Sequence, residues 1–252
     1  MRVIFLLLSL QLFVAQGVVW AQANAFTEGT ITYERTQDWV KIMAAMPHMS
    51  KQAKERAAYN WGNRSEWTRK TALYVKNNAS IYRDIKETSE SGFTWKEGPF
   101  FITRFFGTGL SDDLLELDGK YYRIQDSLQA PAWKIGNDIR EVAGHICMNA
   151  TWEDTLKHQL VSAWFALDIP SPIGPESFFG LPGAILAVDI NNGAIRIEAV
   201  NLSTDSVDES LFSHPRKLKA KPITAIAFRE KTAAYIQYCI QEEQNFAWGM
   251  RY

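Results

Sequence analysis

The stretch "SPIGPESFFGLPGAILAVDINNG", residues 171–193, joins a run of prolines and glycines directly to an aliphatic segment. Proline donates no amide to a strand ladder, and glycine adopts backbone conformations closed to other residues. In the aliphatic part, apolar residues occupy both alternating sets of positions, so neither face of a strand would be polar. The stretch therefore predicts a rigid crossing that delivers residues 184–190 into a strand covered on both faces. The crossing is built on Gly174, Pro175, Gly180, Leu181, Pro182 and Gly183.

The rest of the chain carries repeated strand and hairpin patterns. "GTITYE", residues 29–34, alternates apolar and polar residues with the period of a half-buried strand. Asp118–Gly119 and Asn192–Gly193 each lie between two β-rich runs, which is a strong short-range signal for a hairpin. Antiparallel hairpins are therefore expected to dominate the fold.

Two segments have helical spacing instead. In residues 37–60 the apolar pattern is interrupted at Pro47, and Ser50 stands where a helix N-cap is expected, so this region predicts a helical insertion after the first strand. Residues 229–246 predict an amphipathic helix whose apolar face needs the sheet as its partner. The expected fold class is α+β, mainly β: a single curved antiparallel sheet packed on an inner or C-terminal amphipathic helix.

The N-terminal segment has the layout of a secretory signal peptide. Arg2 is followed by a mostly apolar run that reaches about Val19, and small residues lie at Ala21 and Ala23. We expect cleavage after Ala21, or as late as Ala23, which leaves a single domain over residues 22–252 with no stable membrane span. No cysteine lies near this point for lipid attachment, so the expected location is periplasmic or secreted.

Charge and composition exclude several classes of function. The 27 basic and 28 acidic side chains nearly balance, so no long-range attraction to nucleic acid is expected. The chain has no phosphate-binding loop of the Walker or dinucleotide type and no Gly-x-Ser-x-Gly pentad. These absences favour a protein without a cofactor and without a recognisable catalytic residue.

The histidines and cysteines are the candidate metal ligands, and the two cysteines are also a candidate disulfide. His145, Cys147 and His158 could converge, but a closed zinc site needs a fourth ligand, and a lone histidine beside a thiol is more often packed or exposed. No metal site is predicted. Cys147 and Cys239 could form one long-loop disulfide in an exported chain, although buried reduced thiols are the alternative.

Four pieces of the chain, in order, resemble the GLPGLI family of exported proteins of Bacteroidetes-type bacteria. "GPESFFGLPGAILAV" is similar to the signature hexapeptide, with Ala184 in place of the usual leucine. "GTITYE", "EVAGHICMNATW" and "AWFALDIPSPIGP" are similar to other segments of the family, although His145 stands where an aromatic residue is usual. The resemblance implies a half-barrel sheet like that of envelope lipoprotein carriers, and it implies no catalytic residues.

An excess of aromatic residues without a catalytic constellation favours a non-catalytic binding module. Its expected partner is an apolar small molecule or an envelope protein, held on the concave side of the sheet. Two alternatives stay open: an accessory partner of an outer-membrane receptor or secretion system, and a hydrolase with dispersed catalytic residues. The side chains expected to bind the ligand are Phe101, Phe105, Trp133, Trp152 and Trp164.

Overall fold

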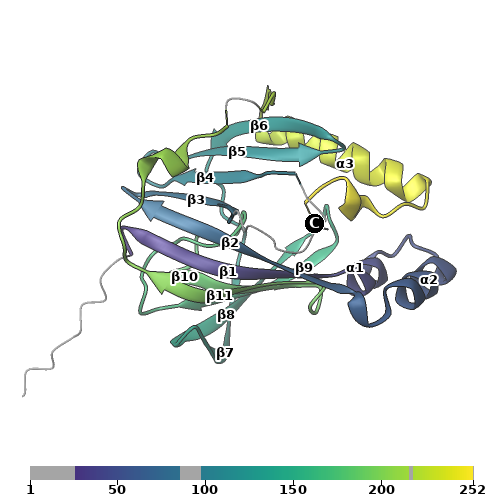
Figure 1. Ribbon diagram of the computed structural model, residues 1–252, viewed down its shortest axis with the longest axis horizontal. Helices are drawn as coiled ribbons and strands as arrows, with labels where there is room; N and C mark the ends of the chain where they lie inside the picture. The colour runs from purple at the N-terminus through teal and green to yellow at the C-terminus, as the bar shows by residue number, and fades with distance from the viewer. Residues whose placement is uncertain (1–25, 86–97, 216–217, 252) are drawn as a thin grey trace, which may run out of the picture.

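The computed structural model describes residues 26–85, 98–215 and 218–251 (Figure 1). The expected signal peptide, residues 1–21 or 1–23, lies outside these residues. None of the helices in the described ranges is long and apolar enough to cross a membrane.

The described residues contain twelve strands that form one sheet in the order β12-β6-β5-β4-β3-β2-β1-β11-β10-β9-β8-β7. Neighbouring strands are antiparallel, except that β12 runs parallel to β6. The mainly β fold expected from the hairpin patterns is therefore confirmed. The strands are β1 (Gly29–Asp38), β2 (Glu66–Lys76), β3 (Ala79–Asp84), β4 (Phe101–Phe105), β5 (Leu110–Leu117), β6 (Lys120–Ser127), β7 (Lys134–Val142), β8 (His145–Asp154), β9 (Gln159–Ala166), β10 (Ala184–Ile190), β11 (Ile195–Ser203) and β12 (Lys221–Ile223).

The helical insertion after the first strand consists of α1 (Trp39–Ala45) and α2 (Lys51–Trp61). Asp38 caps α1 by accepting from the Val40 and Lys41 amides, and the Ser50 hydroxyl caps α2 as the sequence predicts. Three short 3-10 helices are η1 (Gly62–Arg64), η2 (Glu209–Phe212) and η3 (Phe246–Trp248).

The C-terminal helix, α3 (Ala225–Gln241), begins and ends earlier than the predicted range of residues 229–246. Thr224 caps its first turn through the Ala227 amide, so the helix starts before the apolar pattern becomes clear. Glu243 has a φ of 50°, a left-handed conformation that stops the helix. The helix packs on β6, where the ring centroids of Phe228 and Tyr122 lie 5.7 Å apart.

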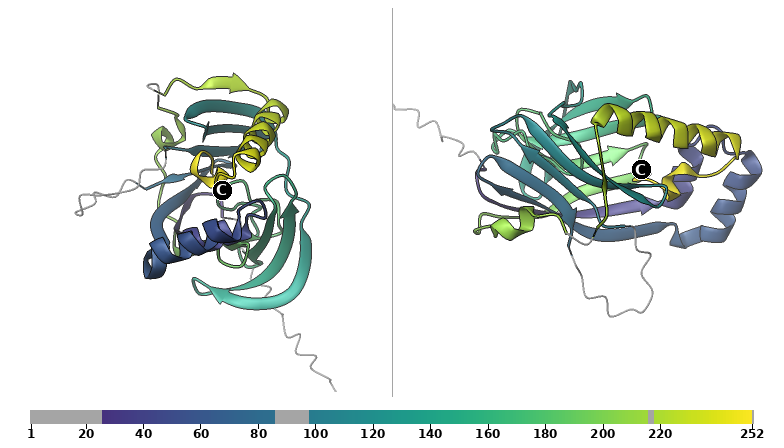
Figure 2. Two further views of the ribbon diagram at one scale, coloured as in Figure 1. Left: turned by 90° about the vertical axis from the view of Figure 1, so that its right-hand side faces the viewer. Right: turned by 90° about the horizontal axis from the view of Figure 1, so that it is seen from above.

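The sheet curves around the C-terminal segment, with α3 along one rim and α1 and α2 across from it (Figure 2). The strand registers assign Ile31, Tyr33, Leu73, Tyr82 and Ile102 to one face. This is the inner, concave face, and these residues are buried in the main core.

Strand β10 is buried on both faces, as the sequence predicts. On the outer face, the end of β7 folds back toward β11, and Arg140 comes within 3.8 Å of Glu198. The Arg140 guanidinium also lies 4.7 Å from the ring centroid of Trp164. Arg140 of β7 thus reaches both β9 and β11, the two strands that flank β10.

The crossing from β9 to β10, residues 167–183, has no strand pairing. Gly180 has a φ of 88°, in the left-handed region expected for a glycine of the crossing. Gly183 does not have a positive φ. A glycine is required at position 183 for another reason, because a Cβ there would overlap the carbonyl oxygen of Ala166.

The charged concave face as a candidate ligand-binding site

Charged side chains occupy inward positions of the sheet that alternation usually gives to apolar residues. Arg35 follows Ile31 and Tyr33 on the inner face of β1 and is 0% exposed. Arg104 of β4 and Asp113 of β5 also point inward, and they form an ion pair. The concave face is therefore partly polar, which is unusual for the core of a small sheet protein.

Glu176, from the crossing, is held between two arginines. Its Oε1 atom accepts from Arg35 Nε at 2.8 Å and from Arg251 Nη2 at 2.9 Å. Burial opposes ionisation of this carboxyl, but the charges of Arg251 and Arg35 outweigh it and lower the pKa of Glu176 to about 2. The crossing is thus tied by charge to β1 and to the C-terminal segment.

Arg251 is the anchor of that C-terminal segment. Its guanidinium stacks 3.5 Å from the ring centroid of Phe100, and Arg69 lies 5.6 Å from the same ring. The preceding residues are fixed on the backbone, where the Asp118 amide donates to the Gly249 carbonyl at 2.6 Å and Met250 forms a bridge with Leu117. Residues 249–251 therefore lie across the concave face as an ordered strip.

Lys157, in the turn between β8 and β9, extends its side chain toward Glu176 and Arg251. The residue is half-buried, lines the inner cavity described below, and donates from its amine to the Arg251 carbonyl at 2.9 Å. Burial lowers the pKa of Lys157; Asp154 and Glu176 oppose this, and Arg251 and Arg35 add to it. Three cations thus meet around Glu176.

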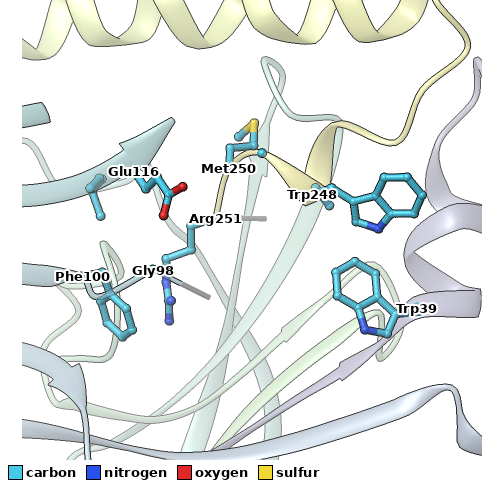
Figure 3. A pocket seen from close by; sticks show the side chains of 10 residues that line it. Trp39, Gly98, Phe100, Glu116, Trp248, Met250 and Arg251 are labelled. Atoms are coloured by element: carbon cyan, nitrogen blue, oxygen red, sulfur yellow. The ribbon is translucent and has the colours of Figure 1, made fainter. Parts of the chain in front are cut away.

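Two cavities adjoin this cluster. The outer cavity, of about 190 Å³, lies between the start of α1, the segment before β4 and the C-terminal strip (Figure 3). The inner cavity has a volume of about 80 Å³, and Lys157, Glu176 and Asp113 are part of its wall. Both cavities are lined by Leu115, Glu116, Met250 and Arg251, so the two spaces adjoin along these four residues.

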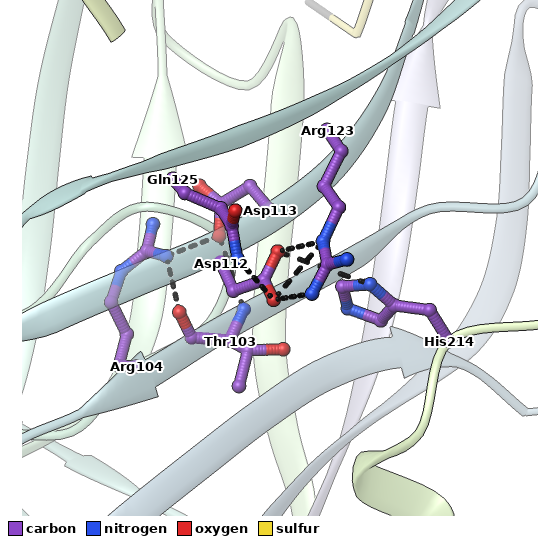
Figure 4. A network of polar contacts seen from close by, with 7 residues as sticks. All are labelled: Thr103, Arg104, Asp112, Asp113, Arg123, Gln125 and His214. Carbon is purple, nitrogen blue, oxygen red and sulfur yellow. Dashed lines mark hydrogen bonds and ion pairs between the residues drawn. The ribbon is translucent and has the colours of Figure 1, made fainter. Parts of the chain in front are cut away.

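The neighbouring carboxylates Asp112 and Asp113 lie on opposite faces of β5 (Figure 4). Asp112, on the outer face, accepts from Arg123 and Gln125 and lies 3.9 Å from Nδ1 of His214. Asp113, on the inner face, accepts from Arg104 and from the Thr103 amide. Burial raises the pKa of Asp113, although Arg104 opposes this.

The five aromatic residues predicted to bind a ligand lie in separate places. Trp133 and Trp152 pack with Phe178 at centroid distances of 6.2–6.4 Å, and Trp133 Nε1 donates to the Phe179 carbonyl at 2.9 Å. Phe101 and Phe105 belong to the outer face of β4, and Trp164 to the outer face of β9 under Arg140. None of these five residues is among the described residues that line the outer and inner cavities. Their role in binding stays a prediction.

The cysteines and His145 show no sign of a catalytic or metal centre in the described residues. Cys147 and Cys239 are buried and are not joined to each other. Burial raises the pKa of both thiols, that of Cys147 to about 11, which opposes a thiolate nucleophile. His145 Nδ1 lies 2.7 Å from Asp168 Oδ2, and no group of three metal-ligating residues is found in the part of the chain that the structure describes.

Comparison with protein families gives one match. A model described as "Protein of unknown function (Porph_ging)" matches residues 152–187, from the end of β8 through β9 and the crossing into β10. The matched residues include the segments on which the resemblance to the GLPGLI family chiefly rests. Membership of that family stays a prediction. A search of curated proteins finds no match.

Comparison with solved structures supports the fold. Two structures of PNGF-II, in space groups C2 and P21, have TM-scores of 0.52 and 0.51 at 12% and 10% sequence identity. The likeness covers 81% of this chain but only 32% of the PNGF-II chain. At this identity it establishes a shared sheet architecture and nothing about activity.

Sequence reasoning singled out none of the charged residues of this cluster, which are Arg35, Lys157, Glu176 and Arg251. One signal was present for Arg35. In "GTITYERT" it continues the Ile31 and Tyr33 side of the alternation, so a charge stands at a position that the pattern buries. No comparable pattern marks the other three.

Proposed function

We propose that this protein is a non-catalytic binding module that holds a small amphipathic molecule on the concave face of its sheet. The observation that carries the proposal is the pair of adjoining cavities beside an ordered charged cluster. Binding sites for small molecules are typically concave and mostly apolar, with a few fixed polar groups that orient the ligand. The outer cavity combines Trp39, Phe100 and Leu115 with Glu116 and Arg251 in this manner.

Trp248 is the residue best placed to contact a ligand as it enters. Its side chain is 63% exposed although it lines the outer cavity, whereas Trp39 on the same cavity is buried. A bound molecule that covered the Trp248 ring would remove a large apolar surface from water, and this burial favours binding.

The test uses Trp248→Ala with Tyr59→Ala as the matched control. Tyr59, on α2, is an even more exposed aromatic residue and lies outside the lining of both cavities. Calorimetry and thermal shift with a panel of amphipathic acids, alcohols and amines should detect a binder whose affinity falls about tenfold or more in Trp248→Ala and is unchanged in Tyr59→Ala. Absence of binding across the panel, together with no small molecule in native mass spectra of the purified protein, would overturn the proposal.

A second candidate function, docking to another envelope protein, is favoured by the β7–β8 hairpin. Strand register assigns Ile135, Ile139 and Ile146 to one face, and all three are exposed. This supports the accessory-partner alternative for an exported protein. Substitution of the three by serine should abolish capture of a partner from envelope extracts, and capture that is unchanged would argue against this surface.

A further inference from the structure

We infer that the inner cavity receives the carboxylate head of an amphipathic acid, bound by the ammonium group of Lys157. The inference rests on the proposed function and specifies the chemical class of its ligand. The body of the acid would extend past the side chains of Leu115 and Met250, which line both spaces, into the outer cavity.

The first support is the hydrogen-bonding state of Lys157. An ammonium group has three N–H donors, and in the described residues this one makes a single hydrogen bond, to the Arg251 carbonyl. The side chain also lines the inner cavity. Two donors are therefore left for a group inside that cavity.

The second support is the charge around the amine. Asp154 and Glu176 attract it, but neither lies within ion-pair distance among the described contacts, and Arg251 and Arg35 repel it. A buried ammonium that lacks a paired carboxylate is costly, because it has lost water without gaining a counter-charge. A ligand carboxylate would supply both the counter-charge and the acceptors.

The third support is the position of the carboxylates around the inner cavity, which favours the Lys157 end of that cavity as the place where an anion binds. Asp113 already accepts from Arg104 and from the Thr103 amide, and Glu116 accepts from the Tyr121 hydroxyl at 3.1 Å. An anion placed beside those carboxylates would be repelled, whereas one placed at Lys157 would meet an ammonium group, and the charge of the nearby Glu176 is already balanced by Arg35 and Arg251. The ligand is therefore expected to enter with its head directed at Lys157.

Size and geometry favour a carboxylate over a phosphate. The inner cavity has a volume of about 80 Å³, enough for a few water-sized groups. The Arg35 and Arg251 guanidiniums, which would suit a phosphate, are already directed at Glu176. The two remaining N–H groups of Lys157 match a carboxylate, which is smaller than a phosphate and carries a single charge.

The experiment compares head groups on one body, using the full chain and the probes 4-phenylbutyrate, 4-phenylbutan-1-ol and 4-phenylbutylamine. We expect calorimetry to give an affinity at least about tenfold higher for the acid than for the alcohol or the amine. Lys157→Met should remove that preference while leaving the affinity for the alcohol unchanged. Lys51→Met, which alters an exposed lysine of α2, should keep the preference.

Two results would overturn the inference, and they differ from failure of the proposed function. Equal affinity of the wild-type protein for the acid and the alcohol overturns it without any variant, so the test survives if Lys157→Met does not fold. A preference for the acid that persists in a folded Lys157→Met variant also overturns it. Failure of the whole amphipathic panel to bind removes the proposed function as well.

Discussion

Gly183 of the crossing lies directly against the backbone of Ala166, the last residue of β9. A Cβ added at Gly183 would overlap the Ala166 carbonyl oxygen and would lie 2.6 Å from its carbonyl carbon. These atoms belong to a strand paired on both sides, so they cannot move away as the end of a flexible side chain can.

We therefore expect Gly183→Val to lower the free energy of unfolding by about 3 kcal/mol or more, as severe overpacking does. Urea denaturation measures this change. Gly107→Ala is the control, because the nearest atom to a Cβ there is Asn78 Cβ at 3.9 Å, an ordinary contact. Equal stability of the two variants would contradict the structural role of the crossing.

Tyr33→Phe tests the hydrogen bond that ties β1 to β10. The Tyr33 hydroxyl donates to the Ile185 carbonyl at 2.8 Å, next to the irregularity between Ile185 and Ala187 where β10 slips against β9. Loss of the hydroxyl leaves a buried carbonyl without this donor, so we expect a loss of about 1–3 kcal/mol in urea denaturation. A change below about 0.5 kcal/mol would mean that another group satisfies the carbonyl.

Glu176→Gln tests the charged cluster through its pH dependence. The pKa of Glu176 is about 2 in the folded protein, below the usual 4.5, so its contribution to stability is complete above pH 4.5 and is lost as the pH falls toward 2. The variant should lose about 3 kcal/mol or more at pH 7, because two buried guanidiniums lose their shared carboxylate.

The same variant should also have a shallower decline of stability between pH 4.5 and 3 than the wild-type protein, measured by urea unfolding at a series of pH values. Glu55→Gln, on an exposed residue of α2, should leave both quantities unchanged. Parallel declines in Glu176→Gln and in the wild type would contradict the low pKa of Glu176.

His214 is expected to make the segment over the outer face of β4 sensitive to pH. Burial lowers the pKa of His214 from 6.5, and Asp112 opposes this most strongly. The other charges close enough to act on the ring are those of Arg123, Asp113 and Arg83. Because the folded state favours the neutral ring, the contribution of His214 is present above pH 6.5 and falls below it. Hydrogen exchange of residues 208–213 should accelerate between pH 7 and 5.5, after correction for intrinsic rates.

The matched variant is His214→Phe, which keeps a ring against Phe101, 5.5 Å away in the wild-type protein, and removes the titration. Its corrected exchange rates should not change over that pH range. An acceleration equal to that of the wild-type protein would assign the effect to another group.

Local patterns predicted the sheet well but not the charged cluster. Asp118 and Gly119 both adopt positive φ between β5 and β6, as a two-residue hairpin turn requires, and the Ser50 cap starts α2 where expected. Such features depend on residues that are neighbours in sequence. Arg35 and Glu176 meet across 141 positions, so no local pattern could have paired them.

The aromatic residues that line the cavities could not be predicted from local patterns either. Strand alternation assigns Phe101 to one face of β4, whereas Phe100, just before the strand, lies in the main core. The sequence alone does not say which face of the sheet is concave. Phe100, which directly precedes the predicted Phe101 in the sequence, lines the outer cavity. The direction of curvature depends on the whole sheet, including the C-terminal strip that it encloses.

The position of β1 between β2 and β11 has a consequence for the order of folding. This strand is the first of the described strands, yet its partner β11 ends at Ser203, so the centre of the sheet joins segments far apart along the chain. Loop-closure entropy makes such pairings slow. The pairs β2–β3, β4–β5 and β5–β6 are joined by short turns and can form early, but β1 keeps an open hydrogen-bonding edge until β11 arrives. A newly made chain would therefore pass through an interval in which the strand that ends at the centre of the sheet is an unpaired edge.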